Sequence, residues 1–226
     1  MTNLSFEFLE KYYPVFIEGI QWTLLVSLLS VIFGVILGTI LCFMKRSKLS
    51  IFKVPILKVI ASIYIEFVRG TPLLLQIFIV YFGSNSFGVK FTPLLACIIA
   101  LSLNSGAYVA EIIRCGIDAV DKGQLEASRS LGMNQRMAMQ HIILPQAIKN
   151  ILPAIGNEFV SIIKESSMAS AIGVAEITYA GKLVTGATYR SLEPLIVAAL
   201  CYFTLTFTLG RLMAYIERRL KSNDSH

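Results

Sequence analysis

Long apolar runs separated by polar stretches are the main pattern along this chain. Three of the runs, residues 19–44, 92–115 and 192–215, contain at most two charged residues each. About 20 apolar residues are enough for a helix to cross the hydrocarbon core of a bilayer. The pattern therefore predicts a membrane-spanning helix in each of these three runs.

Two further runs are less regular. Residues 54–83 are too long for one straight crossing, and Arg69-Gly70-Thr71-Pro72 interrupts them. Proline removes a backbone donor and disfavours helical geometry at the residue before it, so we expect one crossing that is broken at 70–72. Residues 151–172 contain Glu158, Lys164 and Glu165 and form the fifth, weakest candidate. Five crossings place the two termini on opposite sides of the membrane.

The segments outside these runs have their own patterns. Residues 4–17 mix aromatic and acidic side chains, which is typical of a segment lying on the membrane surface. Residues 173–191 hold a short amphipathic patch followed by a turn. Gly34 and Gly38 form a pair of small residues four apart, which marks close contacts between some membrane helices.

The composition agrees with a membrane protein. Of 226 residues, 55% are hydrophobic and 15% are charged, whereas a soluble domain has about 45–50% apolar and about 25% charged residues. This balance excludes a disordered chain and argues against a soluble enzyme. We expect residues 1–226 to form a single all-α integral membrane domain, with no second soluble domain. The four cysteines have no C-x-x-C spacing and are expected to act as small apolar residues.

The basic residues gather on one side of the predicted spans. That side carries fourteen of them: Lys45, Arg46, Lys48, Lys53, Lys58, Arg114, Lys122, Arg129, Arg136, Lys149, Arg211, Arg218, Arg219 and Lys221. The other side carries four, Lys11, Lys90, Lys182 and Arg190, while Arg69 and Lys164 lie at depth. Because cytoplasmic loops are enriched in Lys and Arg, the N-terminus is predicted outside. The segment 116–150 and the C-terminus are predicted to be cytoplasmic. The net charge of +6 thus reflects sorting by membrane side rather than nucleic-acid binding.

The cytoplasmic segment 116–150 reads as a helix–turn–helix. We expect a helix from near Gln124, a break at Leu131-Gly132 and a second helical stretch that closes at Pro145. Glycine supplies the left-handed geometry of many helix ends, and Asn134 can cap the next helix. The apolar residues 142–144 on this cytoplasmic surface favour docking to a partner over a plain solvated connector.

One motif in this segment resembles a known family. The motif is Glu126-Ala127-Ser128, three residues, Gly132, nine residues, and then Ile142-x-Leu144-Pro145. It resembles the EAA loop of binding-protein-dependent ABC importer permeases, with Ser128 in place of the second alanine. The stretches 66–72, 157–159 and 164–167 resemble the polar amino-acid branch of that family, the histidine, arginine and glutamine type. The resemblance covers residues 15–220.

The resemblance implies a type I ABC importer permease fold with five transmembrane helices in a bacterial cytoplasmic membrane. The chain would form the translocation path for a polar amino acid. Its implied partners are a second permease subunit, identical or different, two cytoplasmic ATPases that bind ATP and Mg²⁺, and a separate extracellular amino-acid-binding protein. The implied ATPase-coupling residues are Glu126, Ala127, Ser128, Gly132, Ile142, Leu144 and Pro145.

The sequence contains no G-x-x-x-x-G-K-[ST] phosphate loop, so we expect the energy to come from another chain. His141 and His226 are isolated, and we recognise no catalytic set or metal cluster. The permease alone is therefore expected to be no enzyme and to hold no cofactor or metal.

Polar residues are predicted to meet in one layer near the middle of the membrane. The rise per residue places the middle of the 92–115 span near Asn104 and the middle of the 54–83 span near the break. Polar groups beside a broken helix suit a zwitterionic substrate. The candidate substrate-binding residues are Thr71, Pro72, Gln76, Asn104, Ser105, Tyr108, Asn157, Glu158, Ser161 and Glu165.

Several alternatives remain open at this point. Ser105 and Ser161 could serve only for packing, and Glu66 with Arg69, or Glu111 with Arg114, could neutralise each other. An unpaired Glu158 would favour a cationic amino acid, whereas a paired acid would allow uncharged substrates. The sequence does not say which amino acid is carried. The alternative functions are an ion-coupled secondary transporter and a structural membrane subunit, although secondary transporters often show repeated halves and we find no repeat.

Overall fold

The computed structural model describes residues 4–47 and 55–222, and all regular elements in these ranges are helices. They are α1 (Leu9–Arg46), α2 (Ile56–Arg69), α3 (Leu73–Ser86), α4 (Pro93–Asp118), α5 (Lys122–Ser130), α6 (Gln135–Ala138), α7 (Leu144–Glu165), α8 (Ile177–Thr188) and α9 (Glu193–Ser222). A π-helical turn, Met139–Ile143, leads into α7, and a 3₁₀ turn, Ser166–Ile172, follows it. Lys48, Lys53, His226 and the first residue of the run 54–83 lie outside the described residues.

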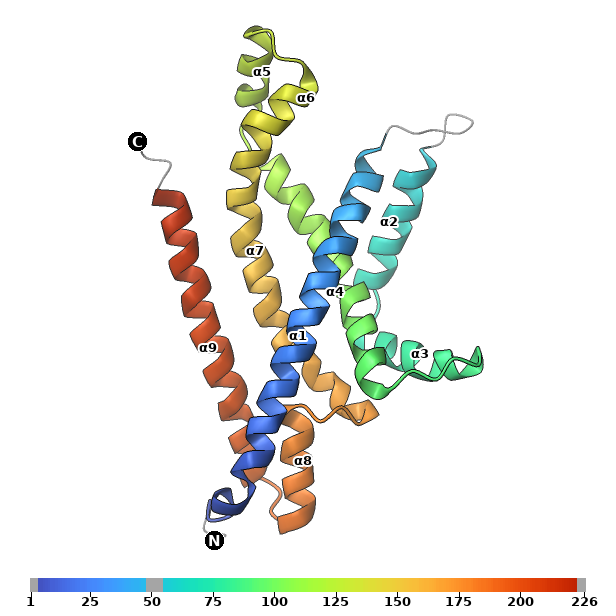
Figure 1. Cartoon of the computed structure of the whole chain (residues 1–226), viewed down its shortest axis with the longest axis vertical. Helices are drawn as coiled ribbons and strands as arrows, with labels where there is room; N and C mark the ends of the chain where they lie inside the picture. The colour runs from blue at the N-terminus through green and yellow to red at the C-terminus, as the bar shows by residue number, and fades with distance from the viewer. Residues whose placement is uncertain (1–3, 48–54, 223–226) are drawn as a thin grey trace.

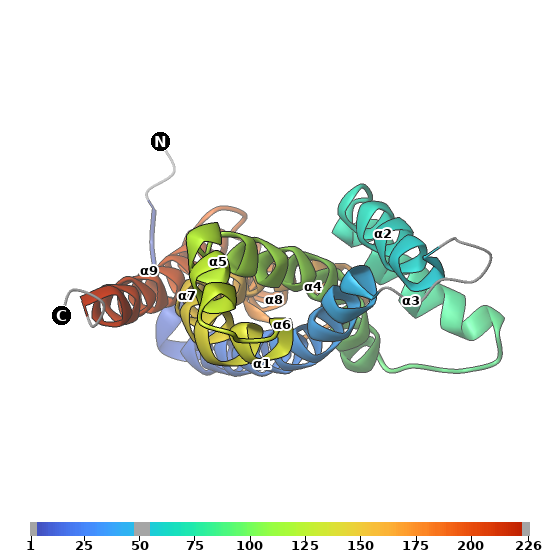
Figure 2. The same ribbon diagram turned by 90° about the horizontal axis from the view of Figure 1, so that it is seen from above.

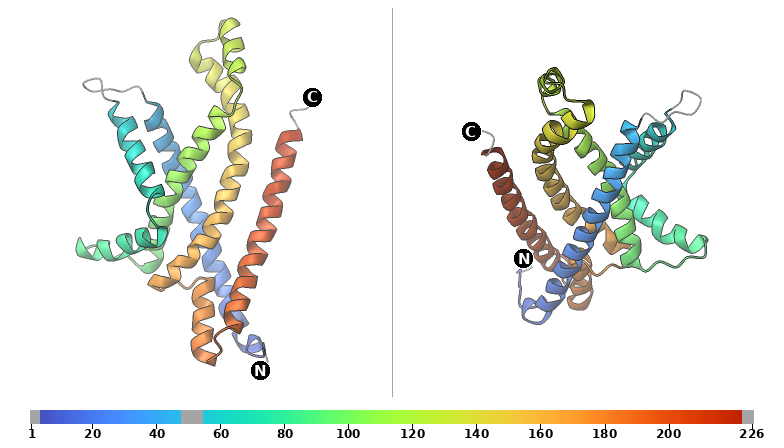
Figure 3. Two further views of the ribbon diagram at one scale, coloured as in Figure 1. Left: turned by 180° about the vertical axis from the view of Figure 1, so that it is seen from behind. Right: turned by 45° about the horizontal axis from the view of Figure 1, so that its top comes forward.

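The long helices run roughly along one axis and form an open bundle (Figure 1). The α5–α6 pair lies at one end of the molecule, beyond the ends of its neighbours, and α8 lies at the other end. The chain ends are also at opposite ends of the bundle. Seen from behind, α9 runs beside α7 on one side of the molecule, while α2 and α3 lie on the other (Figure 3). The all-helical architecture agrees with the expected fold class.

Helices α1 and α4 form the most extensive contact in the bundle. Gly34 and Gly38 are both buried where α1 crosses α4. A Cβ atom on Gly34 would lie 2.7 Å from the Ser105 hydroxyl oxygen, and one on Gly38 would lie 2.7 Å from Val109. The pair of small residues therefore allows a backbone approach that larger side chains would prevent.

The predicted break at 70–72 is confirmed. Helices α2 and α3 meet at an angle of 107°, and Pro72 stands immediately before α3 with extended backbone geometry. The Thr71 hydroxyl donates to the Phe67 carbonyl at 3.0 Å and occupies one of the free acceptors at the end of α2. Helix α3 therefore runs roughly perpendicular to the long helices and points away from the bundle (Figure 1).

Among the described residues, three helices are long and apolar enough to cross a membrane. They are Leu9–Arg46, Pro93–Asp118 and Glu193–Leu220, and the bent α2–α3 pair brings the number to as many as four. Helix α7, which corresponds to the predicted run 151–172, is not among them because it carries Lys149, Glu158, Lys164 and Glu165. It nevertheless lies between α4 and α9 and packs against both.

Two differences from the sequence prediction concern the start of α1 and the passage from α6 into α7. Residues 9–17, which belong to the predicted surface segment 4–17, form the first turns of a continuous 38-residue α1. The buried Phe16 packs in one cluster with Ile177 and Val184 of α8, so tertiary contacts extend the helix past the apolar run. The mixture of aromatic and acidic side chains in residues 4–17 still favours a location at the membrane surface.

The second difference is that the helical stretch after Gly132 does not end at Pro145. It continues through the π-helical turn into α7, with the Leu144 N–H donating to the Met139 carbonyl five residues earlier. Proline lacks an N–H and its ring crowds the carbonyl four residues before it. The wider π turn leaves room for the proline ring and tolerates the missing N–H, so the helix does not end there.

Candidate functional site

The turn predicted at the centre of the segment 116–150 is present. Helix α5 begins at Lys122, where the Asp121 carboxylate accepts from the Gly123 N–H at 2.6 Å. Gly132 has φ +83°, in the left-handed region, and the Asn134 side chain caps α6 by accepting from the Met137 N–H at 2.9 Å. The local sequence thus fixes both helix starts and the reversal between them.

This segment presents an exposed apolar tip. Leu131 is 84% exposed, and Met137 and Leu144 are also exposed. Soluble surfaces rarely gather large apolar side chains without a partner. The motif prediction missed Leu131 and Met137, which lie between its fixed positions.

The predicted coupling residues differ in exposure. Glu126, Ala127, Gly132 and Pro145 are exposed, Ile142 is half-buried, and Ser128 is buried. The Ser128 hydroxyl donates to the Gln124 carbonyl at 2.6 Å. Ser128 therefore faces the inside of the helix pair, which explains why a small residue fits there, whereas Glu126 and Ala127 are on the surface.

Three of the predicted polar residues meet at the break between α2 and α3. The Gln76 side-chain amide donates to the Val68 carbonyl at 2.8 Å and to the Thr71 hydroxyl at 2.8 Å. Asn104 of α4 in turn donates to the Gln76 side-chain oxygen at 3.0 Å. The carbonyl released by the broken helix thus has a partner, and the break is tied to the middle of α4. The expected convergence of Thr71, Gln76 and Asn104 is confirmed.

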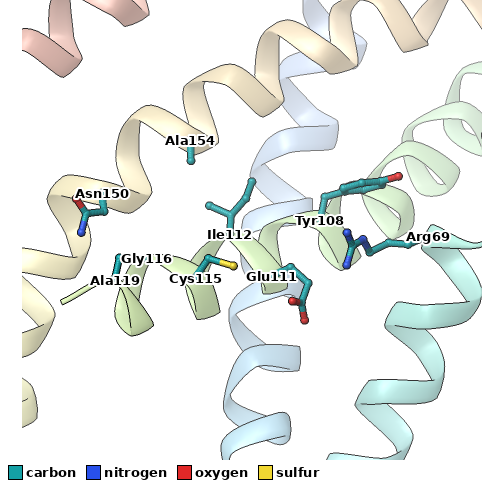
Figure 4. Close-up of a pocket in the computed structure, with 9 residues that line it drawn as sticks. All are labelled: Arg69, Tyr108, Glu111, Ile112, Cys115, Gly116, Ala119, Asn150 and Ala154. Atoms are coloured by element: carbon teal, nitrogen blue, oxygen red, sulfur yellow. The ribbon is translucent and has the colours of Figure 1, made fainter. Parts of the chain in front are cut away.

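A cleft of about 500 Å³ lies between α2, α4 and α7 (Figure 4). Its lining residues are Arg69, Tyr108, Glu111, Ile112, Cys115, Gly116, Ala119, Asn150 and Ala154. The Arg69 guanidinium lies over the Tyr108 ring, 5.3 Å from its centroid. Tyr108 was predicted, whereas Arg69 and Asn150 were not. The charge of Arg69 at mid-span depth was the available signal for it.

Glu111, which lines this cleft, belongs to an ion-pair network. The Glu111 carboxylate accepts from Lys45 at 2.6 Å and from Arg114 at 2.8 Å. Asp118 binds Arg46 at 2.7 Å and Arg114 at 3.0 Å. The pairing of Glu111 with Arg114, which the sequence left as an alternative, is present. The network joins the last turn of α1 to the end of α4, next to α5.

The α7 candidates are less closely connected. Asn157 is exposed, and Glu158, Ser161 and Glu165 are half-buried. The buried Ser105 hydroxyl of α4 has no hydrogen-bond partner among the described residues. Within 4–47 and 55–220, no side-chain hydrogen bond links these α7 residues to Gln76 or Asn104, and a common layer of all ten candidates stays a prediction.

Ser105 and Lys164 have different surroundings. Ser105 is buried against Gly34 of α1, which agrees with the packing alternative. Lys164 opens onto a second cleft of about 440 Å³, together with Ser167, Thr178 and Tyr202. Behind Tyr202, the fully buried Glu176 accepts from the Tyr202 hydroxyl and from the Tyr179 N–H at 2.7 Å. This network fixes α8 against α9.

Comparisons with known proteins agree with this arrangement. Residues 30–222 match the family described as binding-protein-dependent transport system inner membrane component. The arginine transport system permease protein ArtQ of Bacillus subtilis is 44% identical over 98% of this chain and 100% of its own length. A Rickettsia bellii permease assigned by name to glutamine transport, GlnP, is 43% identical over 95% of this chain and 98% of its own.

Solved structures have the same fold. An amino acid ABC transporter crystallised with histidines gives a TM-score of 0.90 at 47% identity, covering 96% of this chain and 100% of the other. The inward-facing MetNI methionine ABC transporter gives a TM-score of 0.75 at 17% identity over 93% and 98% of the two chains. The second match supports the fold alone.

Proposed function

Because this chain belongs to the binding-protein-dependent transport system inner membrane components, and is a permease subunit of an ABC transport system, we propose that its cargo is a polar amino acid. The observation that carries the proposal is the near full-length similarity to ArtQ and to the amino acid transporter structure. A secondary transporter and a structural subunit are not favoured, because neither function accounts for a coupling segment that matches this family.

The permease works with a substrate-binding protein and with ATPase subunits, as a component of a binding-protein-dependent system. The finer assembly that we propose has two permease subunits above two ATPases. Support for a second permease comes from α7, whose exposed Asn157 and Lys164 are too polar to face lipid tails. A facing permease, identical or different, and a polar path between the two would cover this side.

In the proposed topology, the N-terminus is outside and the C-terminus is in the cytoplasm of a bacterium, with five crossings. The distribution of Lys and Arg supports this orientation. It places α5 and α6 on the cytoplasmic side, beyond the bilayer, and α8 on the outer side, where the binding protein would arrive. Helix α7 is the proposed fourth crossing in chain order, with its polar face shielded by protein.

In the proposed mechanism, ATP and Mg²⁺ bind to the two ATPase subunits. The two ATPases then close on each other, and this movement displaces the α5–α6 tip. The exposed residues Leu131, Met137 and Leu144 supply the apolar contact, and Glu126 supplies charge. The π turn connects this tip to α7 without a flexible loop. Movement of the ATPase would therefore tilt a helix that lines the path.

The proposed substrate path runs beside the α2–α3 break and the cleft at Arg69. Pro72 and Thr71 expose irregular backbone there, and Gln76 and Asn104 bring amide groups. The Arg69 guanidinium can pair with the carboxylate that all amino acids carry. We propose that Tyr108 of α4 and Asn157, Glu158, Ser161 and Glu165 of α7 contact the rest of the cargo.

The test is reconstitution of the permease with its ATPase and binding protein in liposomes. We expect a polar amino acid plus binding protein to stimulate ATP hydrolysis and ATP-dependent uptake. Uptake that follows an ion gradient and proceeds without ATP would contradict the proposal and would favour a secondary transporter.

A further inference from the structure

Helix α9 carries an exposed ladder of aromatic and arginine side chains, here called the α9 ladder. Its members recur at every fourth residue: Phe203, Phe207, Arg211, Tyr215 and Arg219. The two phenylalanine rings stack with centroids 5.5 Å apart, and the Arg211 guanidinium lies 5.3 Å from the Phe207 centroid. Arg219 lies 5.5 Å from the Tyr215 centroid and donates to its hydroxyl at 3.0 Å.

The ladder faces away from the protein. Helix α9 packs against α7 and α8 through its opposite face, where Met213 meets Gly156 and Ala198 lies against Gly181. Figure 2 shows α9 at the edge of the bundle. Only 6% of its apolar window is buried, against 61% for α4. The ladder is therefore in contact with whatever surrounds the bundle.

The position of the arginines along α9 matches one membrane boundary. With a rise of 1.5 Å per residue, Arg211 lies about 27 Å from Glu193 along the helix, close to the roughly 30 Å thickness of the hydrocarbon core. Arg218 and Arg219 lie about 10–12 Å further on, at headgroup level. In the proposed orientation, which this inference assumes, that boundary is the cytoplasmic leaflet.

We propose that the arginine end of the α9 ladder, together with Arg218, binds the headgroup of an anionic phospholipid. One guanidinium group can donate two parallel hydrogen bonds to the oxygens of a phosphate group. It keeps this ability when it is stacked on an aromatic face. Arg218 is exposed and uses its Nε–H on the Ala214 carbonyl at 3.2 Å. In the described part of the chain, neither Arg211 nor Arg218 forms an ion pair, so both charges can reach a lipid. The Phe203–Phe207 stack gives the acyl chain an apolar surface.

Selective lipid retention tests this site. The purified permease–ATPase complex is equilibrated in mixed micelles of phosphatidylglycerol and phosphatidylcholine at equal amounts, and the lipid that stays bound after gel filtration is quantified. We expect phosphatidylglycerol to be enriched on the wild-type complex. The double variant Arg211→Gln/Arg218→Gln should lose roughly a factor of five in this preference for each arginine. Equal enrichment on both complexes would overturn the proposal.

Matched controls separate the site from general attraction. Lys11→Gln removes a cation stacked 5.3 Å from the Tyr12 ring at the other end of the molecule and should leave the enrichment unchanged. Arg211→Lys/Arg218→Lys keeps the charge but loses the planar guanidinium group. An intermediate loss of phosphatidylglycerol enrichment in this variant therefore supports binding of the phosphate through two hydrogen bonds from one guanidinium. An equal loss in Lys11→Gln would contradict a defined site, as would displacement of the lipid by excess inorganic phosphate.

The other possible occupant of this face is a second permease. Cross-linking of Phe207→Cys between two permeases in native membranes would assign the face to an interface and overturn the lipid proposal. The lipid assay needs neither amino acid nor ATP hydrolysis. Its failure would therefore leave the transport function intact, and a failed transport assay would leave the lipid result standing.

Discussion

Gly132 sits at φ +83°, where any side chain is strained although no neighbour lies within 4 Å of a Cβ placed there. A non-glycine residue in left-handed geometry costs about 1–2 kcal/mol. We therefore expect Gly132→Leu to distort the turn between α5 and α6 and to lower transport-coupled ATP hydrolysis at least several-fold. Purification of the assembled complex and a hydrolysis assay with binding protein measure this.

Gly132→Asn is the matched control, because asparagine tolerates the left-handed region better than other residues. It should retain most of the coupled activity. Unchanged coupling and unchanged ATPase binding in Gly132→Leu would show that the turn has no role in the connection.

Glu158 is a half-buried charged candidate on α7. If its carboxylate recognises cargo charge, Glu158→Gln should reduce uptake of arginine or lysine about tenfold, the equivalent of about 1.4 kcal/mol. Glutamine uptake should change much less. Glu165→Gln, seven residues further along α7, serves as the comparison, and equal loss for cationic and neutral substrates would argue against direct charge recognition.

The residues at the α2–α3 break could be predicted from the sequence more completely than the residues that line the Arg69 cleft. Thr71, Gln76 and Asn104 could be predicted because proline fixes the break and helix rise fixes the depth. The Arg69–Tyr108 stack could not, since it depends on how α2 packs against α4, which no local pattern specifies. Ser105 illustrates the reverse case, in which a polar residue in the expected layer faces a neighbouring helix.

Among the helices, the junction between α6 and α7 differs most from what the sequence suggests. Proline ordinarily ends or kinks a helix, and the π turn at Met139–Ile143 instead carries the helix through Pro145. Pro145→Ala restores an N–H donor and allows an ordinary α-turn. A π turn contains one residue more than an α-turn, so its loss would rotate the α5–α6 tip by about 100° relative to α7.

We therefore expect Pro145→Ala to retain or slightly raise thermal stability while uncoupling ATP hydrolysis from uptake. The measurement is the ratio of amino acid transported to ATP hydrolysed in liposomes. Pro153→Ala, which changes a proline inside α7, controls for a general effect of proline removal. A normal ratio in Pro145→Ala would show that the π turn does not set the position of the tip.

Hydropathy alone predicted where most of the helices lie, because burial in a bilayer requires long apolar stretches. It could not predict that α3 projects sideways from the bundle or that α1 starts at Leu9, since tertiary contacts decide both. The polar α7 is the opposite case. It fails a hydropathy test yet lies between α4 and α9, because a helix shielded by protein needs no apolar surface all round.

In the whole molecule, the functional parts follow one another along the long axis of the bundle. The α5–α6 tip and the C-terminus are at one end, α8 and the N-terminus are at the other, and the break and the Arg69 cleft lie between them (Figure 1). The ion pairs of Glu111 and Asp118 join α1 to the end of α4 near the tip. A push on the tip can therefore reach the middle of the bundle through α4 and α7.

The most direct test of this account measures uptake and ATP hydrolysis together, in liposomes that contain the complete transporter. In one permease, residues 122–138 are replaced by an unrelated helix–turn–helix of equal length, and thermal unfolding confirms that the rest of the bundle is intact. We expect this variant to lose both amino-acid uptake and the stimulation of ATP hydrolysis by binding protein that carries its amino acid. Uptake at the wild-type rate would contradict this expectation.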